Sequence, residues 1–521
     1  MSAAPAEKVS AFEAAIQPVT DVSNFIWAGT WGGEEVLPIP PMVIVLLGAG
    51  LYFMIGLRFY PVRKLFSSLA TLFKKSDGKG AGEISPFAAL STALSGQVGT
   101  GNLAGVATAI TLGGPGAIFW MWVTALFGMA LAFAEGSLSI RFREKTPDGH
   151  YRGGPMTYIA IGLGKKWQWL AILFCIGALF SSMVTGNGIQ ANSLGDSANE
   201  LFGVEEWVGG LVAAIAVFIV IIGGIKSIGR VAETIVPWMA GLYLIMALVA
   251  LILNAGDLPE TFDRIFSGAF NTQSASGGFL GAAIIMAIRA GVARGLFSNE
   301  AGQGSTPIAH AVAQTNDPAA QGRFAMMGTF IDTVVICTMT ALVMLTVSGD
   351  FTATINGVIT PVEHAWQSDL SGFAMTSGAY AQAFPIELLG IPIGTLIVSV
   401  ALILFVFTTL LTWSYYGERA LTYLYDLLPN ASASGEKRLH MVWRVIWCIV
   451  IFIGSFAPLD LVWRLGDISN AAMALPNIIG LLALSGVVFA LARGNRTAGT
   501  DHGRDTPSEL SEEPSGAAGV H

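Results

Sequence analysis

The stretch SGQVGTGN, residues 95–102, lies inside a long apolar region and combines three glycines with four polar side chains. Glycine weakens a helix because its backbone loses more freedom on folding, and short polar side chains offer the backbone competing hydrogen bonds. A second stretch, GLFSNEAGQGS at residues 295–305, has the same character inside another apolar region. What these two stretches mean depends on the solvent that surrounds the chain.

The composition identifies that solvent. Of the 521 residues, 53% are hydrophobic and only 12% are charged, and the mean hydropathy is +0.63. A water-soluble protein of this length has more charged surface than that. Apolar runs near the ~20 residues that cross a bilayer recur along the chain, and helices are the structure that satisfies their backbone there. The alternating segments of a membrane β-barrel are missing from the sequence, which therefore predicts an all-α integral membrane protein.

We expect about 11 transmembrane helices arranged as a 5+5 inverted repeat with two broken helices. The helix at 41–57 is an additional first span, followed by a first repeat at 84–254 and a second repeat at 278–492. The expected spans are 41–57, 84–113, 116–140, 168–194, 207–225, 235–254, 278–302, 324–347, 388–413, 442–457 and 469–492.

The two ends of the chain are expected to lie outside the bundle. Residues 1–40 carry no signal-peptide pattern and form an exterior segment with a short amphipathic helix on the membrane surface. The residues that mark this helix are Val9, Phe12, Ile16 and Val19. Residues 493–521 are rich in Gly, Ser, Thr, Asp and Glu and are expected to form a disordered cytoplasmic tail.

The basic residues predict the orientation. With the N-terminus outside, the predicted cytoplasmic loops hold 22 of the 27 Lys and Arg residues, which agrees with the rule that positive loops stay inside. Lys8, Arg264 and Arg464 fall outside, whereas Arg289 and Arg294 lie within a span.

Several functional classes lack their motifs. The sequence has no G-x-x-x-x-G-K-[ST] loop, so an ATP-driven pump is not expected. Its six histidines do not cluster in a span, which leaves neither a zinc site nor a general base for an intramembrane hydrolase. The three cysteines lie in apolar segments as packing residues. The net charge of -8 argues against nucleic-acid binding.

The two glycine-rich stretches lie five spans apart, so their helices run in opposite directions. Small residues also allow close helix packing, but two corresponding polar stretches favour paired helix breaks that frame a site. The amides that restart the helix near Gly101 can hold a carboxylate, and carbonyls freed near Ser95 and Val98 can hold a small cation. This pairing suits an amino acid that is carried together with sodium.

Other spans are expected to supply further ligands. The ninth span contains adjacent hydroxyls at Thr408 and Thr409, and Thr409 shares a helical face with Trp413. A threonine in a membrane helix also commonly bonds back to its own helix. Gln190 and Phe297 are candidates for a polar contact and a wall.

The run GGPGAIFWMWVTALFG at 113–128 resembles the signature of the alanine or glycine:cation symporter family, the sodium:alanine symporters. The resemblance extends from about Pro40 to the last span and implies a leucine-transporter-type fold in a bacterial cell inner membrane. VGTGN at 98–102 is similar to the V-G-x-G-N run in the first broken helix of leucine-type sodium symporters.

The resemblance also implies roles for individual residues. The sodium site would comprise the carbonyls of Ser95, Val98 and Phe405 with the hydroxyls of Thr408 and Thr409. The amides of Gly99, Thr100 and Gly101 would hold the substrate carboxylate, and carbonyls near Phe297 and Ser298 would receive the ammonium. The pocket would be completed by Asn102, Gln190, Asn299, Thr409 and Trp413. Asn102 and the Gln97 carbonyl would serve a second sodium, although Gln97 departs from the small residue usual there.

The sequence therefore predicts symport of sodium with a small neutral amino acid, alanine or glycine, without an enzymatic activity or an organic cofactor. A proton-coupled carrier is the alternative, and it requires a titrating side chain at the cation position. An intramembrane enzyme or a sensor is the third alternative. Arg289, Arg294, Glu300 and Asp332 are expected to form gating or structural pairs, whereas Glu135 needs no special role. The exterior loop at 348–386 is either a lid or a connector.

Overall fold

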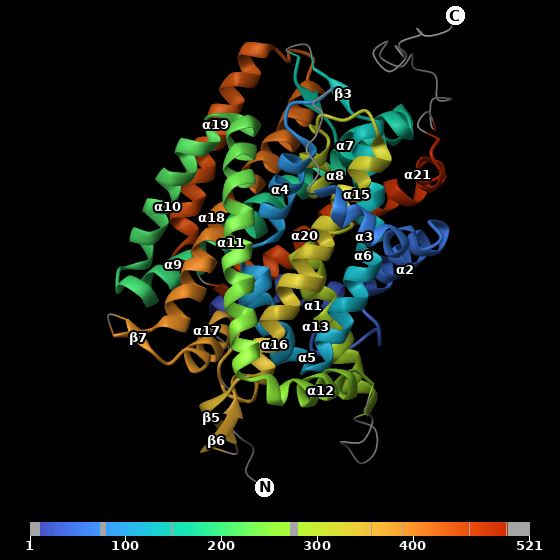
Figure 1. The fold of residues 1–521 in the computed structure, drawn as a ribbon. Coiled ribbons are helices and arrows are strands. Elements are labelled where there is room, and N and C mark those ends of the chain that lie inside the picture. Colours follow the sequence, from blue (N-terminus) through green and yellow to red (C-terminus); the bar gives the residue numbers. More distant parts are fainter. Residues whose placement is uncertain are drawn as a thin grey trace, which may run out of the picture.

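Helices form most of the chain in the computed structural model, which describes residues 11–72, 80–146, 149–270, 280–355, 357–388, 390–457, 459–495 and 498. Figure 1 shows them as a bundle with α11 and α18 along its length and the β5–β6 hairpin at one end. The helices of the first half are α1 (Ala11–Ala28), α2 (Pro41–Gly56), α3 (Tyr60–Leu72), α4 (Pro86–Gln97), η1 (Gly101–Gly105), α5 (Val106–Gly113), α6 (Gly116–Arg141), α7 (Pro155–Thr157), η2 (Tyr158–Gly162), η3 (Lys165–Trp167), α8 (Gln168–Met183), η4 (Val184–Gly188), α9 (Ile189–Phe202), α10 (Glu206–Ile221), α11 (Gly224–Leu253), η5 (Ala255–Asp257) and α12 (Leu258–Phe270).

The second half begins with the other interrupted helix. Its helices are α13 (Leu280–Asn299), α14 (Thr306–His310), α15 (Pro318–Thr329), η6 (Phe330–Cys337), α16 (Thr338–Thr346), η7 (Ala365–Gln367), α17 (Gly372–Ala383), α18 (Ile393–Asp426), α19 (Ala433–Gly454), α20 (Leu459–Ala483) and α21 (Ser485–Ala492). The all-α expectation omitted four antiparallel two-stranded hairpins, which are β1 (Thr30–Trp31) with β2 (Glu34–Glu35), β3 (Glu144–Lys145) with β4 (Tyr151–Arg152), β5 (Ser348–Ile355) with β6 (Val358–His364), and β7 (Glu387–Leu388) with β8 (Ile391–Pro392).

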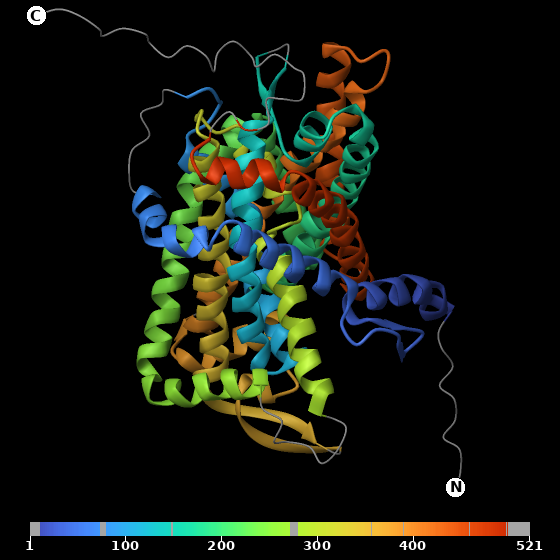
Figure 2. The same cartoon turned by 90° about the vertical axis from the view of Figure 1, so that its right-hand side faces the viewer.

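Six helical segments in the described part of the chain are long and apolar enough to cross a membrane. The bent pair α2–α3, with an angle of 78° between its helices, makes a seventh if it counts as one span, and 101–113 and 206–221 are shorter apolar helices. Figure 2 shows α2 running across the long axis of the bundle. The expected helical chain with several apolar, membrane-length segments is thus confirmed, whereas the count of 11 spans and the 5+5 inverted repeat stay predictions.

Several predicted spans have different limits in the structure. Helix α11 begins at Gly224 rather than 235, and α18 continues to Asp426 rather than 413. The predicted span 469–492 is two helices, α20 and α21, which are separated at Leu484. Hydropathy identifies the apolar part of a helix, but a helix continues through polar residues as long as its backbone bonds are satisfied.

Both predicted interruptions are present. Helix α4 ends at Gln97, Val98 adopts an extended conformation, and the helix restarts as the π-helix η1. The second interruption lies at 300–305, between α13 and α14. Phe297, which we placed at this break, lies with Ser298 in the last turn of α13. The glycines of the stretch mark the break region, but the first residue outside the helix is Glu300, at φ +55°.

The N-terminal helix is longer than the short helix that we expected, and Val9 lies outside the described residues. Helix α1 packs against α20, where the Trp27 indole N–H donates to the backbone oxygen of Asp467 over 3.0 Å. The predicted tail at 493–521 lies outside the described residues except for 493–495 and 498.

Candidate functional site

One hydroxyl on α18 faces three backbone carbonyls. The oxygen of Thr409 lies 3.0 Å from the carbonyl oxygen of Ser95, 3.1 Å from that of Val98 and 2.9 Å from that of Phe405. A hydroxyl has one proton and can donate to only one of them at a time. The Phe405 oxygen also accepts from the Thr408 hydroxyl, whereas the oxygens of Ser95 and Val98 share the one proton of Thr409, an arrangement that suits a bound cation.

The first break releases amides and carbonyls in pairs. In a continuous helix the amides of Gly99 and Thr100 would donate to the carbonyls of Ser95 and Gly96. Instead the Gly99 amide donates to Asn102 Oδ1 over 2.9 Å, and the Thr100 amide donates to the Oε1 atom of Gln190 over 3.2 Å. Side-chain oxygens thus occupy the amides that we predicted to hold a carboxylate.

The second break frees carbonyls in the same way. The amides of Ala301 and Gly302 would continue the helix by donating to the carbonyls of Phe297 and Ser298. The Ala301 amide instead donates to Asn299 Oδ1 over 3.0 Å, and the Gly302 amide donates to a carboxylate on α6 over 3.2 Å. The carbonyls of Phe297 and Ser298 therefore lose their helical donors and can accept an ammonium group.

The two breaks lie against each other. A Cβ on Gly101 would be 3.1 Å from the Cα of Ser298 and 3.2 Å from the Phe297 ring. The Gln97 side chain, at the end of α4, also reaches the second broken helix and donates from Nε2 to the backbone oxygen of Asn299 over 2.6 Å. The structure therefore brings the predicted carboxylate cradle and the predicted ammonium acceptors together.

Asp332 is the member of the site that sequence reasoning left without a specific role. Its Oδ1 accepts from Asn102 Nδ2 over 2.6 Å, and its Oδ2 accepts from the hydroxyls of Ser298 and Thr333 over 2.8 Å each. Asp332 is fully buried, and no Lys or Arg of the described residues forms an ion pair with it. An ionisable residue inside a predicted span was the available signal, but the sequence could not say that it lies beside both breaks or which partners it has.

Trp413 and its neighbours form one wall. The indole N–H donates to Glu300 Oε1 over 2.9 Å, and a Cβ on Gly186 would be 2.4 Å from the indole ring. Gly186 belongs to the π-helix η4, which sequence reasoning did not find. Phe297 lies 4.9 Å from Trp463, ring centre to ring centre, and forms a second wall.

The other two threonine hydroxyls near Thr409 on α18 contact different neighbours. Thr408 donates to the Phe405 carbonyl over 3.0 Å and lies 3.7 Å from the sulfur of Met239. Thr412, which we did not predict, lies 2.5 Å from the Ser95 hydroxyl. The signal for Thr412 was its position three residues after Thr409, on the same face of the helix.

Glu135 has a role that the sequence did not reveal. Its carboxylate on α6 accepts from the amide of Gly302 over 3.2 Å and from that of Gly304 over 3.0 Å. Asn477 Nδ2 on α20 donates to the same carboxylate over 2.7 Å. Glu135 thereby holds the unwound link at 300–305 in place.

The charged pairs that we expected are present only in part. Arg294 lies 3.9 Å from Asp467, and Arg289 lies 4.0 Å from Glu35. Glu300 instead accepts hydrogen bonds from Trp413 and Ser305.

The segment that we predicted as an exterior loop contacts the first broken helix. On α17 the Thr376 hydroxyl donates to the backbone oxygen of Leu103 in η1 over 3.2 Å. The segment therefore touches the first break, and its role as a lid or a connector stays a prediction.

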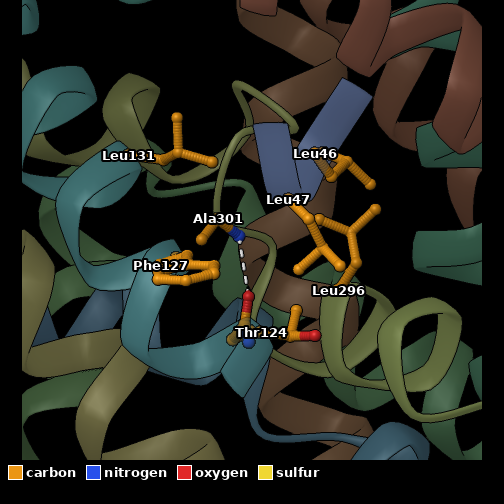
Figure 3. A pocket seen from close by; sticks show the side chains of 9 residues that line it. Leu46, Leu47, Thr124, Phe127, Leu131, Leu296 and Ala301 are labelled. Carbon is orange, nitrogen blue, oxygen red and sulfur yellow. Dashed lines mark hydrogen bonds between the residues drawn. The ribbon is translucent and has the colours of Figure 1, made fainter. Parts of the chain in front are cut away.

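A cavity of about 240 Å³, open solvent included, lies behind the second break rather than between the two breaks. Figure 3 shows Leu46, Leu47, Leu131 and Phe127 around Ala301, with the bond from the Ala301 amide drawn as a dashed line. Its lining is mostly apolar and does not suit a zwitterion.

Comparisons with known proteins show the family of the chain. The model of the sodium:alanine symporter family matches residues 29–506. The chain is 42% identical over 475 residues to the sodium/alanine symporter AgcS of Methanococcus maripaludis, covering 91% of this chain and 95% of that protein. It is 35% identical over 449 residues to the probable sodium/glutamine symporter GlnT of Bacillus subtilis, with 86% of each chain covered.

A solved structure supports the fold. MhsT in complex with L-phenylalanine matches with a TM-score of 0.52 and 14% identity over 82% of this chain and 95% of that chain. This likeness shows the leucine-transporter-type fold that the resemblance implied. The protein is a multi-pass membrane transporter that carries an amino acid with a cation, and not an enzyme. The chain belongs to the sodium:alanine symporter family.

Proposed function

We propose that this protein couples the influx of sodium to the uptake of a small neutral amino acid, alanine or glycine, by alternating access. The observation that carries the proposal is the Thr409 hydroxyl, which faces the carbonyls of Ser95 and Val98 at the first break and that of Phe405 on its own helix. Hard oxygen ligands from an unwound helix suit sodium. In this proposal Thr408 is a weaker member of the ligand set, because its hydroxyl contacts Met239.

The zwitterion lies between the two breaks in this proposal. Its carboxylate replaces the side-chain oxygens of Asn102 and Gln190 at the amides of Gly99 and Thr100, and Gly101 contributes the third amide. Its ammonium binds the carbonyls of Phe297 and Ser298. The family and the relatives AgcS and GlnT support an amino-acid substrate and a sodium partner.

The site favours a small side chain. A Cβ on Gly99 would be 2.8 Å from the Thr409 hydroxyl and 2.9 Å from Gln190 Oε1, so the cradle itself is closely packed and residue 99 has room only for glycine. Trp413 and Phe297 close the remaining sides. These two aromatic walls are the reason to propose alanine or glycine before a longer substrate such as glutamine.

Purified protein in liposomes tests the coupling. We expect an inward sodium gradient to drive uptake of labelled alanine and a proton gradient alone to leave it near background. Thr409→Val should raise the sodium concentration for half-maximal uptake about tenfold, the equivalent of about 1.4 kcal/mol. Thr395→Val on the same helix is the matched control and should leave it unchanged.

Proton coupling is the second candidate, and Asp332 is the observation that favours it. A buried carboxylate next to both breaks is the titrating group that such a carrier needs. Uptake that follows the proton gradient and ignores sodium would reject sodium coupling and select this candidate. Competition of unlabelled glycine, serine and glutamine with labelled alanine then ranks the substrates.

The proposed location is a bacterial cell inner membrane, with the N-terminus outside and the C-terminus in the cytoplasm. The distribution of basic residues supports this orientation, because 22 of 27 lie in the predicted cytoplasmic loops.

A further inference from the structure

Two short segments next to the broken helices are joined by backbone hydrogen bonds. Residues 80–84 lead into α4, and residues 311–316 follow α14. Ile84 and Ala313 form a parallel bridge between them. The bonds run from the Glu83 amide to the Val312 oxygen (2.8 Å), from the Gln314 amide to the Ile84 oxygen (2.8 Å) and from the Thr315 amide to the Ala81 oxygen (3.1 Å).

Arg143 binds both segments with one side chain. Its Nη1 donates to the backbone oxygens of Ala311 and Ala313 over 3.0 and 2.8 Å, and its Nη2 donates to those of Ala81 and Thr315 over 2.8 and 2.7 Å. The guanidinium therefore joins four carbonyls that belong to two separate segments. Hydrogen bonds from a charged donor are among the strong ones, and the planar fork of arginine suits several acceptors at once.

The surroundings hold Arg143 in place. Its guanidinium carbon lies 4.7 Å from the centre of the Tyr151 ring. The Tyr151 amide donates to Glu83 Oε1 over 2.8 Å, which ties the β3–β4 hairpin to the first segment. Burial lowers the pKa of Arg143 to about 10, so the guanidinium remains charged at neutral pH.

Close packing leaves little room in the joined segments. A Cβ on Gly82 would be 2.3 Å from the backbone oxygen of Ala313, and Gly82 has φ +144°. A Cβ on Gly153 would be 2.4 Å from the Cβ of Ala311. Any separation of the segments therefore has to break backbone bonds and these contacts together.

The position of this contact gives it a role in transport. Helix α4 is the half of the first broken helix that precedes its break, and α14 is the half of the second broken helix that follows its break. Both half-helices lie between the site and the end of the bundle that carries Arg143. A substrate can leave toward this end only if α4 separates from α14. The predicted cytoplasmic loops lie at the same end.

We propose that Arg143 is a positioning residue that holds the transporter closed on its cytoplasmic side, by binding residues 80–84 and 311–316 to each other. These two segments and Arg143 form a clasp that must open in each transport cycle. The inference rests on the proposed alternating access but not on which ion or amino acid is carried.

Cysteine labelling of purified protein in detergent tests the clasp without substrate. Ala309→Cys on α14 and Ser91→Cys on α4 are buried reporters, and Ala379→Cys on α17 is a buried reporter on the opposite side of the site. Labelling of each introduced thiol by N-ethylmaleimide is quantified by mass spectrometry, so that native cysteines stay in place. We expect Arg143→Ala to speed labelling at Ala309→Cys and Ser91→Cys at least tenfold and to leave labelling at Ala379→Cys unchanged.

Three further variants make the result specific. Arg143→Lys keeps the charge but lacks the fork, so an intermediate labelling rate is expected. Gly82→Ala forces the two segments apart without changing Arg143, and it should speed labelling at the same two reporters. It therefore tests the clasp even if Arg143→Ala does not fold. Arg141→Gln, two residues away, should leave all rates unchanged. Unchanged labelling in folded Arg143→Ala or in Gly82→Ala, or equally faster labelling at all three reporters, would overturn the proposal.

Discussion

Asp332 connects the two broken helices through single atoms. One carboxylate oxygen binds Asn102 from the first broken helix, and the other binds Ser298 from the second. A charged acceptor strengthens both bonds, and it fixes the side chains that lie next to the proposed carboxylate and ammonium sites. Binding of the substrate should therefore depend on the charge of a residue that does not have to touch the substrate.

Asp332→Asn tests that dependence. The amide keeps the shape of the side chain but removes the charge, and it places a donor opposite hydroxyls that now donate. A loss of about 1.5–3 kcal/mol is typical for a bond to a charged group, so we expect the half-saturating alanine concentration to rise at least about tenfold. Uptake at fixed sodium measures it. Asp263→Asn, at an exposed position of α12, is the control; identical constants in both variants would contradict the role.

Gly304 tests the close packing of the second break. It has φ +89°, and a Cβ there would lie 2.6 Å from atoms of both Phe174 and Pro155. Gly357 has φ +79° with nothing within 4 Å of a Cβ, so Gly357→Ala measures the backbone strain alone. Strain costs about 1–2 kcal/mol and overpacking about 1–3 kcal/mol more.

Thermal unfolding in detergent should therefore show a larger fall in melting temperature for Gly304→Ala than for Gly357→Ala. Equal falls would mean that the neighbours of Gly304 move aside without cost.

The predicted sodium ligands show what local sequence can and cannot specify. The resemblance carried by the run VGTGN implied that Ser95, Val98 and Thr409 meet, and the structure brings them within hydrogen-bonding distance. Thr408 and Thr412 could not be ranked from the sequence, because which hydroxyl faces α4 depends on how α18 is rotated against it. That rotation is set by packing over the whole helix.

At the scale of elements, side chains from neighbouring helices replace the missing backbone bonds. Glu135 on α6 accepts the two amides of Gly302 and Gly304, and Gln190 on α9 accepts the amide of Thr100. Without such partners an unpaired amide inside a membrane is costly. The interrupted helices are therefore stable only within the assembled bundle.

Glu135→Gln tests this support. The amide side chain offers one oxygen where the carboxylate offers two, so one of the two glycine amides faces an N–H₂ group instead of an acceptor. We expect a loss of stability of about 1–3 kcal/mol, which is the cost of an unsatisfied buried group. Thermal unfolding in detergent should show a lower melting temperature and liposome uptake should decrease.

Glu205→Gln, at an exposed position just before α10, is the control for Glu135→Gln and should behave like the unmodified protein. If Glu135→Gln has the same melting temperature as the control, water must satisfy the glycine amide that has lost its acceptor, and the proposed support by Glu135 would be wrong.

The position of the second break explains another limit of sequence-based prediction. Glycines and polar residues at 295–305 marked the region correctly, but the helix continues to Asn299. Its end is set where Glu135 and Asn299 capture the next amides, and these partners cannot be identified from local spacing. The π-helices η4 and η6 were missed for a similar reason, because a π-turn changes one hydrogen-bond register without a composition signal.

At the scale of the whole molecule, composition was sufficient to predict a helical membrane protein, and the family and fold bear this out. The limits of single helices were less predictable, because α11 and α18 continue beyond their apolar parts. Three of the hairpins could not be predicted either, since their strands of two residues have no periodicity to detect. The longer strands β5 and β6 lie in the segment at 348–386, which we predicted to be a lid or a connector.

The orientation of the molecule is testable with two exposed positions. Asp350→Cys lies in the β5–β6 hairpin, and Lys166→Cys lies in a predicted cytoplasmic loop. In whole cells an impermeant maleimide should label Asp350→Cys and not Lys166→Cys, and in inside-out vesicles the pattern should reverse. The unmodified protein gives the background from native cysteines, and labelling of Lys166→Cys in intact cells would contradict the orientation.

The carbonyls around Thr409 have a consequence for the sequence of events in a cycle. The carbonyl oxygens of Ser95 and Val98 share the single proton of the Thr409 hydroxyl, so a positive ion among these oxygens would draw the first break and α18 together. We therefore expect obligatory order: the ion arrives first, and only then do the neighbouring amides adopt a geometry that retains the amino acid. Raising the external sodium concentration should lower the alanine concentration that gives half-maximal uptake. Raising the alanine concentration at very low sodium should not restore the maximal rate of uptake.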